Sequence, residues 1–427
     1  MPDKSPNIIL IITHDTGRWH GCYGTDLPTP SIDAVAAAGA RMDRYFCTYP
    51  MCSPSRASIL TGKYPHTHGL MALQHVPHDM VLDTSITLPK CLAGAGYSTH
   101  LFGFQHEHKD ARELGYETVV RSFGPKWTDI DRAANVAPAV EWFLRSRPDG
   151  PFFASVGFFE THRPFDEPCY TPADPDAVRL PGWLEDTPHN RLEMAQLHGL
   201  ARAADEAVGR IDRALHDSGL ADNTIFIITT DHGMHFRRAK ATLYDAGIAT
   251  GLIIRWPERI SPGTVCDAML SNIDLMPTLL EAVGLETPEG VQGESFLAAL
   301  TGADFQGRSE IFAEQTYRMQ YDPMRCIRTD TFKLIRNFDP DAIRPLIPEQ
   351  VRDERNWVAE RKATWELYDL QTDPQEQRNL AGLREFTEVE SSLRGRLEAW
   401  MRETDDPILN GPISKWVRAP MAQVSGE

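Results

Sequence analysis

Long hydrophobic runs and an excess of basic residues are both missing from this sequence of 427 residues. The first apolar run, residues 8–12, is short and has no cleavable signal pattern before it, and no later run approaches the roughly 20 residues of a membrane span. Acidic residues outnumber basic ones by 60 to 43, for a net charge of -17, which argues against nucleic acid or an anionic membrane as a partner. An anionic substrate would therefore need a local basic pocket.

Cysteines with the spacing of a metal or disulfide framework are missing as well. The seven cysteines are odd in number, scattered and without C-x-x-C spacing, which indicates neither a disulfide framework nor a zinc knuckle. A reducing compartment suits such a chain, and we expect a cytoplasmic enzyme. No H-E-x-x-H helix is present, so the histidines concentrated between residues 66 and 108 indicate a substrate pocket, with His75 and His78 as candidates for its wall.

Apolar segments do alternate with helical patterns along most of the chain. Residues 7–13 enclose a continuous apolar run, which is typical of a central parallel strand covered on both faces. Similar apolar runs recur at 99–102, 152–158, 224–229 and 251–254. Helical patterns lie between them at 31–38, 88–95, 192–216 and 273–283. This alternation predicts a doubly wound α/β sheet.

The pattern changes after residue 304. Short alternating segments at 324–336 and 365–369, followed by a helical segment at 386–402, predict a smaller C-terminal α+β subdomain on a short antiparallel sheet. We therefore divide the chain into a catalytic α/β domain, residues 1–304, and a C-terminal subdomain, residues 305–427.

Two further segments of the C-terminal part suggest surface features. Residues 339–360 are rich in proline and charge and predict a long surface loop or lid. The tail from residue 407 carries Ile408, Leu409, Ile413 and Trp416, which predict an arm that packs on a second copy of the chain. We therefore expect a homodimer.

Cys52 opens the pentapeptide Cys-Ser-Pro-Ser-Arg at residues 52–56. Ser53 suits a helix cap and Pro54 suits the first helical position, so we expect a helix to begin here. The side chain of Cys52 would then face the positive end of the helix dipole, which favours anions. Arg56 follows about one turn later, and a guanidinium beside a nucleophile suits an oxyanion substrate. On the pentapeptide alone, a buried structural cysteine is an equal alternative.

Two of the apolar runs end in similar polar sequences. Asp15 follows the first run in Thr-His-Asp-Thr-Gly, and Asp231 follows the fourth in Thr-Thr-Asp-His-Gly. Because ligands bind at the carboxyl ends of strands in open α/β sheets, we expect these side chains to converge. Carboxylates there could hold a divalent cation that polarises the oxygens of a substrate. Taken singly, each aspartate fits a turn or a helix cap better than a ligand.

The longer segment from Cys52, Cys-Ser-Pro-Ser-Arg-Ala-Ser followed by Leu-Thr-Gly-Lys-Tyr-Pro-His, resembles the signature of the sulfatases. This resemblance implies that a formylglycine-generating enzyme oxidises Cys52 to formylglycine, whose hydrated aldehyde is the nucleophile. It also implies the alkaline-phosphatase/sulfatase-like α/β fold, with a doubly wound mixed sheet. The resemblance covers nearly the whole chain.

The same resemblance implies one divalent cation, Ca²⁺ or Mn²⁺, held by Asp15, Asp231, His232 and the residue formed from Cys52. Sulfatases carry two aspartates after the first strand, where this chain has His14 and Asp15. His14 therefore either joins the ligands or lines the site. The additional imidazole softens an oxygen-rich site, which is why Mn²⁺ is an alternative to Ca²⁺.

Other residues take their expected roles from sulfatase motifs. His162, in a His-Arg-Pro-Phe segment, would protonate the leaving group. Lys240, four residues before a Tyr-acid pair, would contact the sulfate together with Arg56. His106 would be the base that helps to release sulfate. Substrate-binding roles are expected for His75, His78, Arg163 and Arg237.

The C-terminal region narrows the resemblance further. Residues 323–335, 365–381 and 400–407 are similar to the corresponding part of N-sulfoglucosamine sulfohydrolases. The chain departs from the sulfatase pattern at Phe104, which stands where sulfatases have a lysine, so one sulfate-binding cation is missing. Either another group supplies that charge or the pocket accepts a different charge distribution.

We therefore predict a metal-dependent hydrolase of sulfate esters or sulfamates that acts on a small anionic sulfated substrate. A phosphonate monoester or phosphodiester hydrolase would use nearly the same site, and the Asp231-His232 pair and the missing lysine favour it. A phosphate mutase would use Ser or Thr in place of Cys52. A binding protein for sulfated ligands would keep Cys52 unmodified and would bind without turnover.

Overall fold

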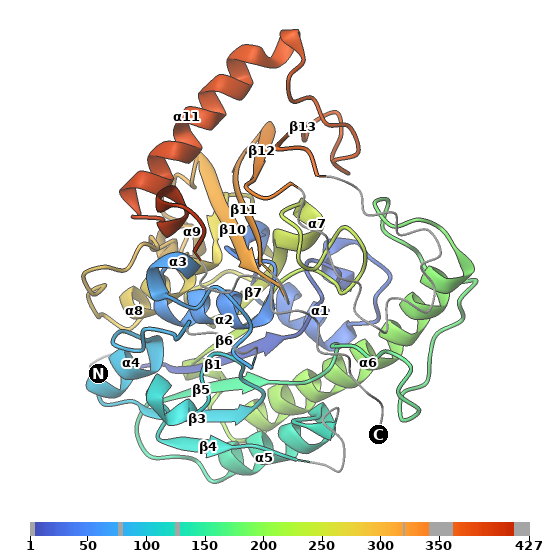
Figure 1. The fold of residues 1–427 in the computed structure, drawn as a ribbon. Coiled ribbons are helices and arrows are strands. Elements are labelled where there is room, and N and C mark those ends of the chain that lie inside the picture. The colour runs from blue at the N-terminus through green and yellow to red at the C-terminus, as the bar shows by residue number, and fades with distance from the viewer. Residues whose placement is uncertain (1–4, 76–79, 124–128, 319–320, 341–361, 414–427) are drawn as a thin grey trace, which may run out of the picture.

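A nine-stranded mixed sheet lies at the centre of the computed structural model, which describes residues 5–75, 80–123, 129–318, 321–340 and 362–413 (Figure 1). The strand order is β4-β3-β5-β1-β6-β7-β2-β8, with β9 paired to β2. The strands are β1 (Asn7–Thr13), β2 (Ala40–Phe46), β3 (Ser98–Gly103), β4 (Thr118–Val120), β5 (Phe152–Gly157), β6 (Thr224–Thr230), β7 (Ala249–Arg255), β8 (Thr264–Cys266) and β9 (Leu270–Ser271).

The direction of the strands decides where their ends meet. Strand β1 pairs in parallel with β5 and β6, and β5 pairs in parallel with β3. Strand β7 is antiparallel to both β6 and β2, so β2 runs in the same direction as β1. The carboxyl ends of β1, β2, β3, β5 and β6 therefore share one edge of the sheet, and the amino end of β7 lies at that edge too. The expected mixed sheet is confirmed.

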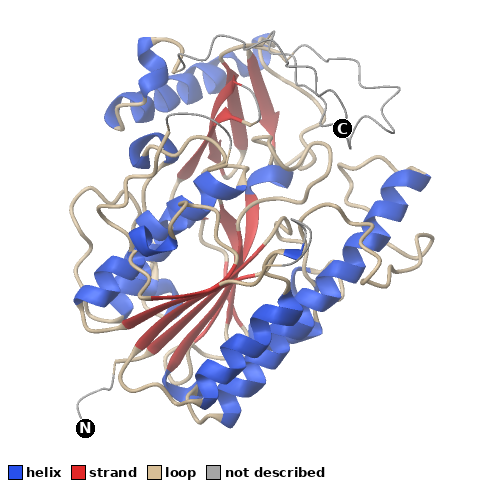
Figure 2. Cartoon of the chain, turned by 60° about the horizontal axis from the view of Figure 1, so that its bottom comes forward, coloured by secondary structure: helices blue, strands red, loops and turns tan. Residues whose placement is uncertain are grey.

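Helices cover both faces of the sheet (Figure 2). Successive residues of β1 point to opposite faces, so they enter two different cores. Ile8, Leu10 and Ile12 pack in one core, and Ile9 and Ile11 pack in the other. The first core contains side chains of α2 (Cys52–Thr61), α4 (Leu88–Gly94) and α8 (Leu275–Ala282). The second contains side chains of α1 (Pro30–Ala37), α5 (Ala133–Arg145) and α6 (Pro188–Asp217). Short helices are α3 (Pro65–His68), α7 (Asp245–Ile248) and α9 (Leu297–Leu300).

A four-stranded antiparallel sheet follows in the C-terminal part, as expected. It consists of β10 (Glu310–Tyr317), β11 (Tyr321–Thr329), β12 (Phe332–Asn337) and β13 (Trp365–Asp369), and α11 (Thr387–Glu403) packs on it (Figure 1). Ile327 and Leu334 face α11, whereas Cys326 and Ile335 pack with Leu243 of the larger part of the chain. The sheet is thus buried on both faces. The domain boundary at residue 304 stays a prediction.

A buried charged cluster joins this smaller sheet to the segment that follows α2. Arg325 is fully buried; its guanidinium bonds Asp406 at 2.5 and 2.9 Å and lies 3.2 Å from a carboxylate oxygen of Glu314. The other oxygen of Glu314 accepts a 2.9 Å bond from the backbone N–H of His66 and lies 2.8 Å from its ring. Buried charges need such partners, so the cluster fixes the C-terminal sheet beside α3 and, through it, α2.

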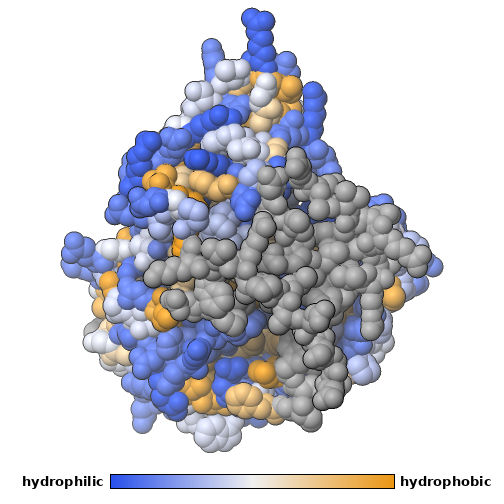
Figure 3. All heavy atoms as spheres, in the orientation of Figure 1, coloured by the Kyte–Doolittle hydropathy of each residue, from blue (hydrophilic) through white to orange (hydrophobic). Residues whose placement is uncertain are grey.

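The described surface has the mixture of side chains expected of an ordinary globular chain. Figure 3 shows hydrophilic side chains over much of the visible face, with apolar ones in small separate groups. No helix in the described ranges has both the length and the apolar composition needed to cross a bilayer.

The expected C-terminal arm is wrong in part. Ile408 is buried and Ile413 packs against the same core cluster as α11, so these side chains belong to the chain's own core, whereas Leu409 is exposed as expected. Trp416 and most of the predicted lid at 339–360 lie outside the described residues.

Candidate active site

The topology brings the predicted site residues to one edge of the central sheet. Strands β1, β3, β5 and β6 contribute residues of the segments that follow their carboxyl ends. These residues are His14 and Asp15 after β1, Phe104 and His106 after β3, His162 and Arg163 after β5, and Asp231, His232 and His235 after β6. Cys52 opens α2 after β2, and Lys240 lies in the segment that leads to α7 and β7.

Helix α2 begins two residues earlier than the sequence predicts. Cys52 is its first residue and Met51 is the N-cap, so the expected cap at Ser53 is wrong. The hydroxyl of Ser53 instead accepts a 3.0 Å bond from the backbone N–H of Gln74. Cys52 still lies at the amino end of the helix, and Arg56 is one turn further along the same helix.

Five donor groups converge beside Cys52: His14, Asp15, Cys52, Asp231 and His232 each place one ligand atom within 4.8 Å of all the others. The Nδ1 atom of His14 lies 3.0 Å from an oxygen of Asp15 and 3.3 Å from one of Asp231. The Nε2 atom of His232 lies 3.2 Å from Asp15 and 3.3 Å from the sulfur of Cys52. Neighbouring ligands of a divalent ion at about 2.1–2.4 Å are about 3.0–3.4 Å apart, so this donor set fits one divalent cation.

Both carboxylates are paired with buried cations. Lys240 donates to the two oxygens of Asp15 at 2.7 and 3.0 Å, and the Nε of Arg56 donates to Asp231 at 3.0 Å. Burial alone would raise the pKa of Asp15, but Lys240 and the neighbouring imidazoles outweigh burial and lower it well below its usual range. The pKa of Asp231 is lowered for the same kind of reason, by His232, His14 and Arg56. Both groups are therefore ionised at neutral pH, as metal ligands must be.

The thiol of Cys52 is only 2% exposed. Burial raises its pKa above the usual range of a thiol, although Lys240 acts in the opposite direction. The side chain as encoded is therefore neutral and a weak nucleophile at ordinary pH, because the thiolate is the reactive form.

A cavity of about 590 Å³ opens over this cluster. Cys52 and Lys240 lie at its base, and Phe104, His106, His162 and His235 contribute to its walls. His75 lines it as expected, with its Nδ1 2.8 Å from the Nε2 of His106.

The remaining expected substrate contacts have different places. Arg163 lines the cavity, but its guanidinium forms two bonds with Glu193. Arg237 is exposed and does not line the cavity. His78 lies outside the described residues. Of the three expected substrate contacts that the structure describes, His75 and Arg163 line the cavity and Arg237 does not.

His235 belongs to the site although sequence reasoning did not select it. Its Nδ1 is buried without a hydrogen-bond partner among the described residues and lies 3.6 Å from an oxygen of Asp15. It lines the cavity and its ring centre is 6.0 Å from that of His162. The only signal in the sequence is its position four residues after Asp231, in the loop that follows β6.

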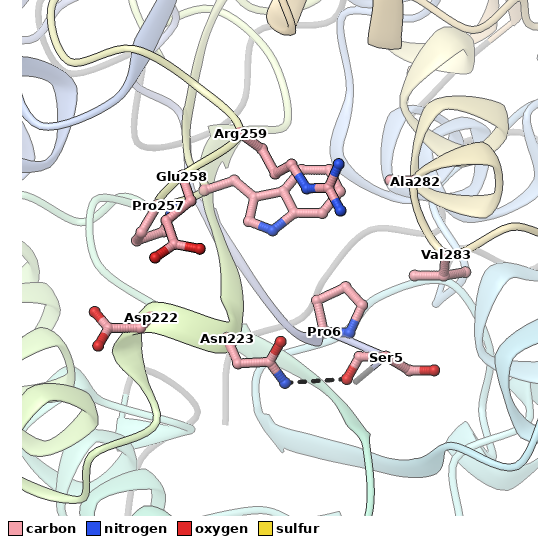
Figure 4. Close-up of a pocket in the computed structure, with 10 residues that line it drawn as sticks. Ser5, Pro6, Asp222, Asn223, Pro257, Glu258, Arg259, Ala282 and Val283 are labelled. Atoms are coloured by element: carbon pink, nitrogen blue, oxygen red, sulfur yellow. Dashed lines mark hydrogen bonds between the residues drawn. The ribbon is translucent and has the colours of Figure 1, made fainter. Parts of the chain in front are cut away.

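A second cavity, of about 250 Å³, lies at the opposite edge of the sheet (Figure 4). Ser5 and Pro6 precede β1, Asn223 precedes β6, and residues 256–259 follow β7, so its walls come from the ends of these strands remote from Cys52. Asn223 and Ser5 are joined there by a 3.1 Å hydrogen bond. None of the predicted site residues within the described ranges lines it.

Comparison with known sequences gives two family matches. The chain matches the family described as Sulfatase over residues 6–285, and that described as N-sulphoglucosamine sulphohydrolase, C-terminal, over residues 231–348. Human N-sulphoglucosamine sulphohydrolase is 29% identical, with 97% of this chain and 92% of that protein covered. An ulvan-active sulfatase of Formosa agariphila is 28% identical, with 96% and 82% covered.

Solved structures share the fold. A putative sulfatase from Bacteroides thetaiotaomicron has a TM-score of 0.77 at 20% identity, with 95% of this chain and 94% of that chain covered. A protein solved in complex with its substrate D-glucosamine-2-N,6-O-disulfate has a TM-score of 0.74 at 22% identity, with 97% and 100% covered. The phosphonate monoester hydrolase of Agrobacterium radiobacter also has a TM-score of 0.74 at 22% identity, with 93% and 96% covered.

The mixed sheet with a carboxylate- and histidine-lined site at one edge is thus a fold that this chain shares with solved structures of sulfatases. Because the family match spans more than half of its length, the chain belongs to the sulfatase family. It is accordingly a hydrolase of sulfate esters or sulfamates.

Proposed function

We propose that this chain hydrolyses a sulfate ester or sulfamate of a small anionic substrate, such as a sulfated or N-sulfated sugar, at residue 52. The observation that carries this proposal is the convergence of two ionised carboxylates, two imidazoles and Cys52 within 4.8 Å at the base of a cavity. A relative is named N-sulphoglucosamine sulphohydrolase, and a protein of the same fold was solved with an N-sulfated glucosamine. Both names support a sulfated sugar as the substrate.

The proposed nucleophile is the hydrated aldehyde of formylglycine, made from Cys52 by a formylglycine-generating enzyme. The raised pKa of the thiol supports this conversion, because an unmodified, neutral Cys52 would attack sulfur poorly. An aldehyde hydrate supplies a hydroxyl nucleophile at this position, and covalent catalysis divides the hydrolysis into two easier steps.

The proposed metal ligands are Asp15, Asp231, His232, His14 and residue 52. His14 is included because its Nδ1 contacts both carboxylates. A bound divalent cation would lower the charge on the substrate oxygens and polarise them. Two imidazoles among the donors favour Mn²⁺ over Ca²⁺, since Ca²⁺ takes oxygen ligands.

Arg56 and Lys240 are proposed to hold the ionised donors and the substrate oxygens in place. Both side chains are at least 93% buried, and the carboxylates that they contact outweigh burial and raise the pKa of each above its usual value. They therefore remain charged in the closed site. Fixed charges of this kind need no reorganisation when negative charge develops in the transition state.

His162 and His106 are proposed to move protons. The Nδ1 of His162 lies 2.6 Å from the carbonyl oxygen of Arg163, so Nδ1 carries the proton in the neutral ring and Nε2 is left to exchange a proton with the leaving group. Burial lowers the pKa of His106 well below its usual value, and the adjacent His75 lowers it further. A neutral His106 suits the base that helps to release sulfate.

We expect kcat/KM of the wild-type protein to fall as pH rises through the neutral range. We expect His162→Gln to lose this dependence on pH. Burial and the ammonium of Lys240 lower the pKa of His162 to about 3, so above that pH its acid form decreases about tenfold per pH unit. His162→Gln should lower kcat/KM by about 10²-fold at the acidic end of the range. A wild-type profile that rises with pH, or a variant with the same slope, would contradict the assigned role of His162.

A phosphonate monoester or phosphodiester hydrolase is the second candidate. The two imidazoles in the donor set and Phe104 at the cavity wall favour it, and the Agrobacterium radiobacter enzyme has the same fold. An aryl sulfate, an N-sulfated glucosamine and an aryl phosphonate monoester should be compared with the same purified protein. We expect the larger kcat/KM for one of the sulfated compounds, and a larger value for the phosphonate would assign the second function instead. The homodimer and the cytoplasmic location stay predictions.

A further inference from the structure

A hydrogen bond joins two imidazole rings at the wall of the cavity. The Nδ1 atom of His75 lies 2.8 Å from the Nε2 atom of His106, and the two rings are parallel to within 2°. Parallel rings that stack face to face cannot bring two atoms this close, so the rings lie side by side in nearly one plane, as an N–H···N hydrogen bond requires. One nitrogen of this bond therefore carries a proton and the other accepts it.

The two ends of this pair have different surroundings. The Nδ1 atom of His106 is buried and has no hydrogen-bond partner among the residues that the structure describes. The ring of His106 lines the cavity together with Cys52. His75, by contrast, is an exposed residue. The pair thus connects a buried nitrogen of the site with the surface of the protein.

His106 is held in place by its own segment of the chain as well as by His75. Its backbone N–H donates to the carboxyl group of Glu107, and the side chain of Gln105 accepts a 2.9 Å bond from the backbone N–H of Glu107. The ring of Phe104 packs edge-on against the ring of His106, with centres 5.5 Å apart. What His75 contributes to this arrangement is a partner for Nε2. Removing the ring of His75 should therefore leave the position of His106 unchanged.

A proton taken up by His106 is unfavourable where it first arrives. Burial lowers the pKa of His106 well below its usual value, and His75 and Arg56 lower it further. The divalent cation proposed for the donor cluster would act in the same direction. A base in these surroundings works best when a second group takes over the proton, and the Nε2 atom of His106 is bonded to such a group.

We propose that His75 is a positioning residue that relays the proton taken up by His106 to solvent while sulfate is released. The proposal rests on the proposed function and concerns the second half of that reaction. The bond from Nε2–H of His106 to Nδ1 of His75 selects the tautomer in which Nδ1 of His106 keeps the lone pair of a base. As Nδ1 takes the proton of the remaining hydroxyl at residue 52, the Nε2 proton passes to His75, and the Nε2 proton of His75 passes to water.

Bonds and protons balance over the whole cycle. The bond between the carbon of residue 52 and the sulfate oxygen breaks as the carbonyl group forms, and sulfate leaves with the electron pair of that bond. When water then adds to the carbonyl group, Nδ1 of His106 returns its proton to the carbonyl oxygen, and the adding water gives one proton to solvent. The reverse shift along the pair, with a proton from water to Nε2 of His75, restores both tautomers.

The first and the later turnovers of an aryl sulfate separate this role from a contact with the substrate. In quenched-flow measurements, His75→Ala should release the first equivalent of phenol at the wild-type rate, because His75 does not act in the first half of the reaction. Later turnovers should be at least about tenfold slower than in the wild type, since release of sulfate loses its relay. A slower first turnover, or later turnovers at the wild-type rate, would overturn the proposal.

Two further measurements separate a relay from a fixed hydrogen bond. A glutamine side chain accepts a hydrogen bond but passes no proton on, so His75→Gln should be as slow in later turnovers as His75→Ala. Free imidazole should restore the later turnovers of His75→Ala, because residue 75 is exposed, and should leave His75→Gln slow. Wild-type rates in His75→Gln, or no response of His75→Ala to imidazole, would overturn the relay.

His108 provides a matched control. It lines the same cavity, but its Nδ1 lies 2.8 Å from the carbonyl oxygen of Asp110. His108→Ala should keep the wild-type ratio of first to later turnovers, and imidazole added to the wild-type protein corrects for any effect on the bound cation. A wild-type protein that turns over no sulfated compound would overturn the proposed function as well. Wild-type turnover together with unchanged later turnovers in His75→Ala would overturn the relay alone.

Discussion

Replacing Cys52 with Ala should reduce turnover of the best sulfated substrate by at least about 10⁴-fold, because the proposed nucleophile is made from this side chain. The loss should be in kcat, since Arg56, Lys240 and the donor groups remain to bind the substrate. Removing one buried sulfur atom should lower the free energy of unfolding by only about 1 kcal/mol. Steady-state kinetics measures kcat, and unfolding by denaturant of the same preparation measures the free energy of unfolding.

Cys47 provides a matched control for this variant. It is also a buried cysteine, 1% exposed, but its sulfur lies 3.8 Å from the carbonyl oxygen of Gly247 and it does not line the cavity. Cys47→Ala should lose a similar small amount of stability and keep its turnover. Turnover by Cys52→Ala at a rate near that of the wild type would refute the assignment of the nucleophile.

Replacing Asp231 with Asn should remove the bound divalent cation and reduce kcat/KM by at least about 10³-fold. The amide keeps the shape of the side chain but loses a negative charge next to His14, His232 and Arg56. It also leaves the buried guanidinium of Arg56 without its carboxylate, which should destabilise the fold by about 3 kcal/mol. Elemental analysis of the purified variant measures the metal content per chain.

Asp406→Asn separates loss of the metal from loss of stability. Asp406 is another buried aspartate paired with a buried arginine, Arg325, but it lies in the C-terminal part, away from the donor cluster. This variant should be destabilised about as much as Asp231→Asn and still retain one metal ion per chain and its turnover. If Asp231→Asn retains the metal, or if a chelator leaves the wild-type protein fully active, the proposed metal site is wrong.

The sequence predicted the central strands and the convergence of the site because both follow from simple rules. The apolar runs that became β1, β5 and β6 could be recognised by their continuity, and parallel strands must end at one edge of a sheet. Asp15 and Asp231, separated by 216 positions, are consequently joined by a 3.0 Å bond from the backbone N–H of Asp15.

Other features depend on packing that no local pattern encodes. Strand β2, Ala40–Phe46, contains two arginines and an aspartate and has no continuous apolar run, because it lies towards the edge of the sheet. His235 reaches the site only because of the path of the loop after β6. The expected N-cap at Ser53 is wrong because the hydroxyl of Ser53 accepts a hydrogen bond from the backbone N–H of Gln74, which is 21 positions away.

The mass of the tryptic peptide that spans residues 45–56 tests the central claim most directly. This peptide contains both Cys47 and Cys52, so fragment ions distinguish the two positions and Cys47 serves as an internal standard. In protein that turns over substrate, residue 52 should have exchanged sulfur for oxygen and lost two hydrogens, while Cys47 remains a thiol. An unmodified cysteine at position 52 throughout an active preparation would contradict the account.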